Sequence, residues 1–154
     1  MKRTTLVLGL LAAALLAGGT GGYLWWRAQA RAEIFAAAIP AQPDLSHWPV
    51  QMRERVAAAE HKLTDSPLEG LAELSRLYHA NGFFAEAAQC YAGLEQLQPA
   101  EARWFHLHAI ILAGYGDAVP ALPLWQRAVR LAPDYLPAHL RLGDVYLKLN
   151  DFAA

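Results

Sequence analysis

A period of 34 residues is the feature that most constrains the fold of this chain. When residues 68–101 are aligned with residues 102–135, large, small and turn-forming residues fall on residues of the same kind. The matching pairs are Leu71 with Phe105, Tyr78 with Leu112, Gly82 with Gly116, Ala87 with Ala121, Tyr91 with Trp125 and Pro99 with Pro133. A fixed period of this length predicts stacked units, each of which buries its apolar face only against its neighbours.

Each unit has the pattern of two helices joined by a tight turn. Leu71, Leu74 and Tyr78 recur at the spacing of one helical face, so they predict a buried stripe on the first helix. Gly82 and Gly116 follow these first helices and can adopt the positive φ that ends a helix. In each second helix an alanine permits close crossing, an aromatic residue fills space beside the next unit, and a proline ends the unit.

These residues closely resemble the tetratricopeptide repeat. The stretch LRLGDVYLKLNDFAA is similar to the first half of that family's pattern, and YAGLEQLQP and WQRAVRLAP are similar to its second half. The resemblance implies an all-α fold, an α-solenoid of helical hairpins. Its units are a first repeat over residues 68–101, a second over 102–135 and the first half of a third over 136–154. The third unit lacks a second helix and a polar cap, so we expect the array to continue beyond Ala154.

The sequence departs from the family pattern at several positions. Ser75 and Ala109 replace the expected glycine, and His108 stands where leucine is usual. Pro123 falls inside the predicted second helix of the second repeat. Because proline removes a helical hydrogen bond, we expect that helix to start late, near Pro120, or to bend.

Residues 1–32 predict a transmembrane helix. The run from Thr4 to Trp26 has 23 residues without a charge, and a helix of that length is about 34 Å long, enough for a bilayer core of about 30 Å. Lys2 and Arg3 precede the run, which favours a cytoplasmic amino terminus. Aromatic residues and an arginine at the far end suit the membrane interface.

A cleaved signal peptide is the alternative interpretation of this segment, with a small-x-small site at Ala28–Ala30. Both interpretations place residues 33–154 outside the cytoplasm, and we expect a bacterial periplasm. Residues 33–48 predict an extension of the helix and then an extended, proline-rich linker, because PAQPDLSHWP cannot hold a regular helix. A leading helix follows over residues 49–64. Ser66, Pro67 and Glu69 then have the pattern of a capping box.

The resemblance implies that the first helices of successive repeats line a concave groove for a protein or peptide partner. By family position, the exposed residues of these helices are Glu69, Ala72, Arg76, His79, Arg103, His106, Ile110, Ala113, Pro137, Leu140, Asp144 and Leu147. The candidate partner-binding residues are the polar ones: Glu69, Arg76, His79, Arg103, His106 and Asp144. We expect a non-catalytic, membrane-anchored scaffold for protein–protein interaction. The alternatives are the docking portion of a larger enzyme or redox assembly, and a structural spacer.

Composition and spacing predict no catalytic, cofactor or metal site. The net charge of −1 gives no electrostatic basis for binding nucleic acid. His106 and His108 are two residues apart, so on a helix they point in nearly opposite directions and cannot easily share an ion. We expect His108 to pack between helices. Cys90, the single cysteine, is expected to be a small buried residue rather than a nucleophile.

Overall fold

The computed structural model describes residues 2–114 and 118–148, and it describes the side chains of residues 20–114 and 118–148. Seven helices lie in these ranges, which confirms the all-α prediction. They are α1 (Lys2–Ala38), α2 (Val50–Asp65), α3 (Pro67–Ala80), α4 (Phe84–Leu97), α5 (Ala102–Gly114), α6 (Leu122–Leu131) and α7 (Leu136–Lys148). The chain divides into two compact units, residues 1–36 and residues 37–154.

The first unit is one continuous helix, most of α1. Tyr23, Leu24, Trp25 and Trp26 are exposed on it. In the part of the chain whose side chains are described, no helix is both long and apolar enough to cross a membrane. The predicted span from Thr4 to Trp26 falls mainly on residues whose side chains lie outside the described part, so the transmembrane helix stays a prediction.

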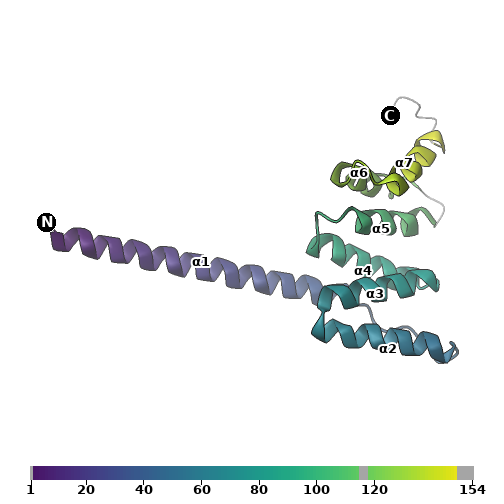
Figure 1. The fold of residues 1–154 in the computed structure, drawn as a ribbon, viewed down its shortest axis with the longest axis horizontal. Coiled ribbons are helices and arrows are strands. Elements are labelled where there is room, and N and C mark those ends of the chain that lie inside the picture. Colours follow the sequence, from purple (N-terminus) through teal and green to yellow (C-terminus); the bar gives the residue numbers. More distant parts are fainter. Residues whose placement is uncertain (1, 115–117, 149–154) are drawn as a thin grey trace. The chain divides into compact units, whose positions relative to one another are not determined.

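In the second unit, α2 to α7 stack in chain order (Figure 1), and each of α3 to α7 packs on the helix before it. Residues 40–48 contain no helix, as their prolines require. This segment is not simply extended, however. The amide of Trp48 donates to the carbonyl of Leu45 at 3.0 Å, and the Trp48 ring lies 4.9 Å from the ring of Phe83, just before α4.

The capping box predicted at the start of α3 is wrong. Ser66 occupies the N-cap position, but its side chain makes no capping hydrogen bond. Ser66, with φ of −139° and ψ of 71°, is also the C-cap residue of α2. A single non-helical residue therefore separates α2 from α3. Glu69 does not reach back to Ser66 and instead pairs with Lys62 of α2 at 3.5 Å.

Residues 34 positions apart have similar burial in the pair α3–α4 and the pair α5–α6. The buried pairs are Leu71 and Phe105, Ser75 and Ala109, Ala87 and Ala121, Tyr91 and Trp125, and Leu94 and Ala128. Between α3 and α4 the chain turns at Gly82, whose φ of +83° strongly favours glycine. Gly116, which the sequence places at the next such turn, lies outside the described residues. The same spacing of buried residues therefore recurs in both hairpins.

The start of α6 confirms the prediction made from its proline. The helix begins at Leu122, so that Pro123 lies in the first turn, where its missing amide costs no helical hydrogen bond. Trp125 of α6 packs into a core with Phe105 of α5 and Val145 of α7. The side-chain amide of Gln126 donates to the Tyr146 hydroxyl at 3.0 Å and adds a polar link between α6 and α7.

Candidate functional site

Two adjoining cavities lie along the first helices of the hairpins. The smaller, of about 320 Å³, is lined by His79 of α3, Phe84 of α4, and Ile110 and Ile111 of α5. The larger, of about 360 Å³, lies between α5, α6 and α7. Ile110 and Gly114 line both cavities, so the two are neighbours on one surface.

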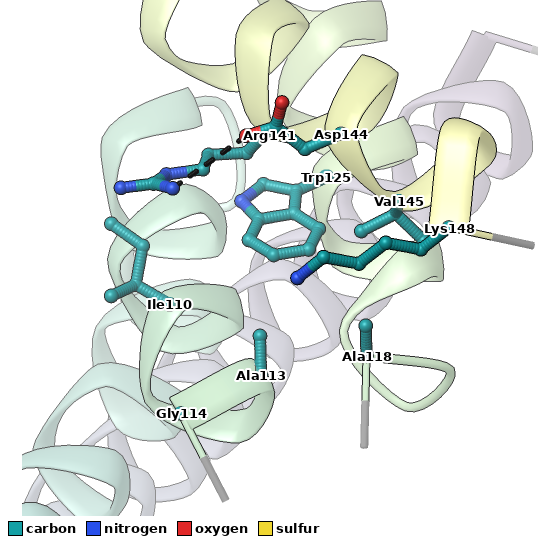
Figure 2. Close-up of a pocket in the computed structure, with 9 residues that line it drawn as sticks. All are labelled: Ile110, Ala113, Gly114, Ala118, Trp125, Arg141, Asp144, Val145 and Lys148. Carbon is teal, nitrogen blue, oxygen red and sulfur yellow. Dashed lines mark ion pairs between the residues drawn. The ribbon is translucent and has the colours of Figure 1, made fainter. Parts of the chain in front are cut away.

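The larger cavity has an apolar wall and a charged rim (Figure 2). Its wall includes Ile110 and Ala113 from α5, Trp125 from α6 and Val145 from α7, and its rim carries Arg141, Asp144 and Lys148 from α7. Arg141 Nη1 lies 3.7 Å from Asp144 Oδ2, an ion pair between exposed side chains. The cavity thus combines a surface for apolar atoms with groups that can orient a polar ligand.

Two of the six candidate residues line these cavities. Asp144 stands on the rim of the larger one, paired with Arg141. His79 lines the smaller one, and its Nδ1 lies 3.3 Å from the Tyr91 hydroxyl. Burial lowers the pKa of His79, which favours the neutral imidazole.

Three other candidates are exposed but line neither of these two cavities. Arg76 is exposed on α3. Arg103 pairs with Glu101 at 3.5 Å, and its guanidinium carbon lies 4.7 Å from the centroid of the Trp104 ring. Glu69 is held by the contact with Lys62 described above.

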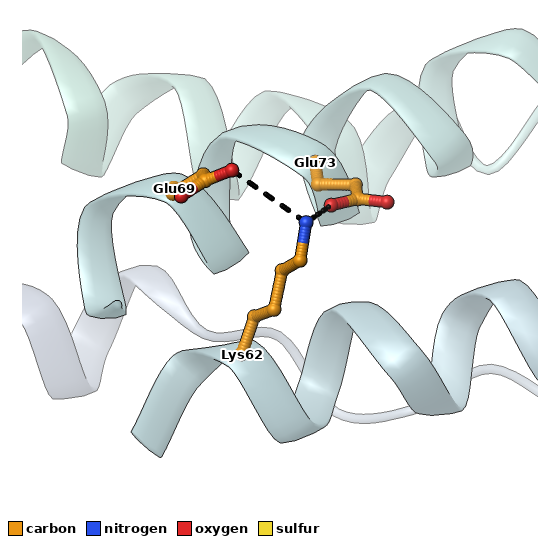
Figure 3. Close-up of polar contacts among 3 residues, drawn as sticks. All are labelled: Lys62, Glu69 and Glu73. Carbon is orange, nitrogen blue, oxygen red and sulfur yellow. Dashed lines mark hydrogen bonds and ion pairs between the residues drawn. The ribbon is translucent and has the colours of Figure 1, made fainter. Parts of the chain in front are cut away.

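Glu69 belongs to a polar cluster that joins α2 to α3 (Figure 3). Lys62 Nζ donates to Glu73 Oε2 at 2.7 Å and lies 3.5 Å from Glu69 Oε1. The hydrogen bond between Lys62 and Glu73 raises the pKa of the ammonium group and lowers the pKa of the Glu73 carboxyl. The cluster connects two helices of the stack, which gives Glu69 a structural role that its helix position did not predict.

The expected exposure of His106 is wrong. Only 6% of this residue is exposed, because the segment before α7 lies over it and the Tyr135 ring meets it edge-on at 5.3 Å. Its Nδ1 has no hydrogen-bond partner among the described residues. Burial, with a smaller effect from the charge of Arg141, lowers the pKa of His106. Ala72, another position expected to be exposed, is also buried.

His108 packs between helices, as expected, but it also has a partner that the sequence did not reveal. Its Nδ1 lies 2.9 Å from Glu95 Oε1 of α4, and both side chains are largely buried. Within residues 20–114 and 118–148, no group of three or more His, Cys, Asp or Glu residues could hold a metal ion. Cys90 is fully buried, and burial raises the pKa of its thiol to about 12, as expected of a core residue.

The sequence interpretation missed the three side chains of the larger cavity that carry a hydrogen-bond donor, Trp125, Arg141 and Lys148. Arg141 and Lys148 lie three residues before and four residues after Asp144, so the helical repeat places all three on one face and could have identified them. Trp125 was assigned only a packing role, although its indole nitrogen is a hydrogen-bond donor. No family model matches this sequence, and no curated protein matches it at a significant level.

Proposed function

We propose that this chain is a membrane-anchored tetratricopeptide-repeat scaffold whose first-helix surface binds a segment of a partner protein outside the cytoplasm. The observation that carries the proposal is the pair of adjoining cavities that share Ile110. Together they offer a mostly apolar site of two adjoining cavities with polar groups at its rim, which suits a peptide segment with more than one contacting side chain.

The repeat assignment is supported by the burial pattern. Positions 34 residues apart are buried in both hairpins, including a small pair, Ala87 and Ala121, and an aromatic pair, Tyr91 and Trp125. Each helix from α2 onward packs on its chain neighbour, as expected when stacked hairpins bury one another's faces.

The anchor is supported by the uncharged run from Thr4 to Trp26 and by the aromatic side chains exposed near its end. Aromatic side chains of this kind are enriched where a helix leaves the bilayer. Membrane fractionation tests the anchor. We expect the full chain to stay in the membrane pellet through both high-salt and alkaline washes, and release by either wash would contradict a transmembrane anchor.

The partner surface is tested by charged substitutions in the full chain. We expect Ile110→Glu, which puts a charge at the point shared by both cavities, to lose partners that the wild-type chain retains after crosslinking and purification. Val50→Glu is the matched control, because Val50 is exposed on α2 and lines neither of these cavities. A second arm combines Arg76→Glu with Arg103→Glu to test the candidates outside the cavities.

The outcomes separate the two parts of the surface. Loss of a partner only in Ile110→Glu assigns binding to the cavities, and loss only in the arginine double variant assigns it to the flanking charges. Recovery of the same proteins by all variants, with helical content unchanged by circular dichroism, would refute a partner-binding role for this face.

A further inference from the structure

We propose that His106 makes the docking of α7 dependent on pH, so that mild acid releases this helix and dismantles the larger cavity. This inference rests on the proposed function, because it concerns the regulation of the same surface. It is carried by the burial of His106 beneath the segment that leads into α7, and by the small buried surface of α7 itself.

His106 is a titratable group in a site that suits only its neutral form. The residue is 6% exposed, and its Nδ1 has no hydrogen-bond partner among residues 20–114 and 118–148. The Tyr135 ring, from the segment before α7, meets the imidazole edge-on at 5.3 Å. Protonation would give both ring nitrogens an N–H and the ring a positive charge, and a buried charge without a partner is costly. Histidine is also the side chain whose charge normally changes in mild acid.

The carboxylates that α4 and the start of α5 bring to this region belong to other pairs. Glu95 of α4 lies 2.9 Å from Nδ1 of His108, the histidine on the other side of α5. Glu101, just before α5, pairs with Arg103 at 3.5 Å. In the described part of the chain no carboxylate forms an ion pair with His106, so no acidic group there would stabilise its protonated form.

The charges on α6 and α7 also disfavour protonation. Burial, and then the positive charge of Arg141 on α7, lower the pKa of His106. Asp144 does not offset this charge at His106, because it is paired with Arg141 at 3.7 Å on the rim of the larger cavity (Figure 2). Arg127 of α6 is a further cation, and it packs over an aromatic ring of α5. Movement of α7 and the segment before it would expose the imidazole to water and take Arg141 away.

The helix that would move is held by a small buried surface. Over Leu136–Lys148, α7 buries two of its residues, Ala138 and Val145, whereas α3 buries seven. A hydrogen bond from Gln126 to the Tyr146 hydroxyl adds a polar link to α6. Elements with few buried apolar contacts open at free energies well below that of global unfolding. Because α7 supplies one wall and the charged rim of the larger cavity, its release removes the proposed partner surface.

Hydrogen exchange of the full chain in detergent micelles measures this opening. Protection factors, which are corrected for the pH dependence of the chemical exchange step, are compared for the amides of α7 and α3. The open state takes up the proton at the usual histidine pKa of 6.5, and the closed state takes it up less readily. Lowering the pH from 7.5 to 5 therefore raises the opening equilibrium, by up to about thirtyfold for one proton. We expect the protection of α7 to fall severalfold or more, and that of α3 to be retained.

Variants assign the effect to His106. His106→Phe keeps a ring that cannot take up a proton, so the protection of α7 should change less than about twofold with pH. Arg141→Gln removes the like charge from an exposed position, and it should make the fall smaller. His108→Gln and His139→Gln are the matched controls, on α5 and α7, and should leave the fall unchanged. Protonated His139 can still donate from Nε2 to the Pro133 carbonyl, which lies 2.7 Å away.

Three outcomes would overturn the proposal. They are unchanged protection of α7 in the wild-type chain, an equal loss of protection in α3, which would indicate global unfolding, and a fall of the same size in His106→Phe. If His106→Phe does not fold, a fall in Arg141→Gln as large as in the wild-type chain has the same consequence.

Photo-crosslinking at each pH separates this proposal from the proposed function. Partners captured by the wild-type chain at pH 7.5 should be lost at pH 5, and His106→Phe should capture them at both. A chain that captures no partner at either pH, but whose α7 opens in acid, would refute the proposed function and leave the pH-dependent docking of α7 supported.

Discussion

Gly70 gives the sharpest test of the packing between α2 and α3. It lies inside α3, where alanine would be favoured over glycine by about 1 kcal/mol from helix propensity alone. A Cβ at this position, however, would lie 2.6 Å from the backbone nitrogen of Leu63 and 2.8 Å from the carbonyl carbon of Lys62. Both are backbone atoms of α2, so no side-chain rotation can relieve the overlap and the helices must separate.

The expected magnitude follows from these two opposing effects. Overpacking of this kind typically costs about 1–3 kcal/mol, which exceeds the propensity gain. We therefore expect Gly70→Ala to lower the free energy of unfolding by up to about 2 kcal/mol. The displacement would also strain the contact between Lys62 and Glu73, which spans the same two helices at 2.7 Å.

Gly143→Ala is the matched control for Gly70→Ala. Gly143 also lies inside a helix, α7, but a Cβ there would meet no described atom within 4 Å. The same substitution should stabilise the chain by about 0.5–1 kcal/mol. The measurement is urea unfolding of the full chain followed by circular dichroism at 222 nm. Shifts of the same sign and size in the two variants would refute the close approach of α2 and α3.

Two further predictions concern buried groups. Cys90, whose thiol pKa is raised to about 12 by burial, should react with Ellman's reagent at pH 8 only after urea is added, and rapid labelling of the folded chain would contradict this. Burial lowers the pKa of His79 and His106, so the unfolded chain takes up protons more readily as the pH falls below the usual histidine value of 6.5. The free energy of unfolding should therefore fall between pH 7.5 and pH 5, and less steeply in His106→Phe. The free energy of unfolding is measured by urea unfolding at each pH. If it falls equally steeply with pH in the wild-type chain and in His106→Phe, His106 does not contribute to the pH dependence.

Several features of the fold could be predicted from short stretches of sequence. The spacing of Leu71, Leu74 and Tyr78 indicates one buried helical face, and all three are buried. Gly82 marks a turn that uses its positive φ, and Pro123 predicts the late start of α6. These features depend on backbone sterics and on the helical repeat, which act between residues close in sequence.

The candidate site was predicted less well, because its residues depend on distant neighbours. The position of His106 in the repeat pattern predicted an exposed residue. Instead, Tyr135, in the segment between α6 and α7, packs against its ring. Glu69 was expected to bind a partner, but it forms an ion pair with Lys62 of the preceding helix. No local pattern states which side chain a neighbouring helix will bring into contact.

The sequence by itself therefore determined where the helices of the stack lie and the buried stripe of α3, because helix formation and amphipathic spacing are local properties. Only the tertiary structure decided which polar groups meet a partner and which are left without one. The indole N–H of Trp125 is the clearest case, since the residue type alone shows that this group can only donate a hydrogen bond. Its lack of an acceptor among residues 20–114 and 118–148, and the cations that share its cavity, depend on how α5, α6 and α7 pack together.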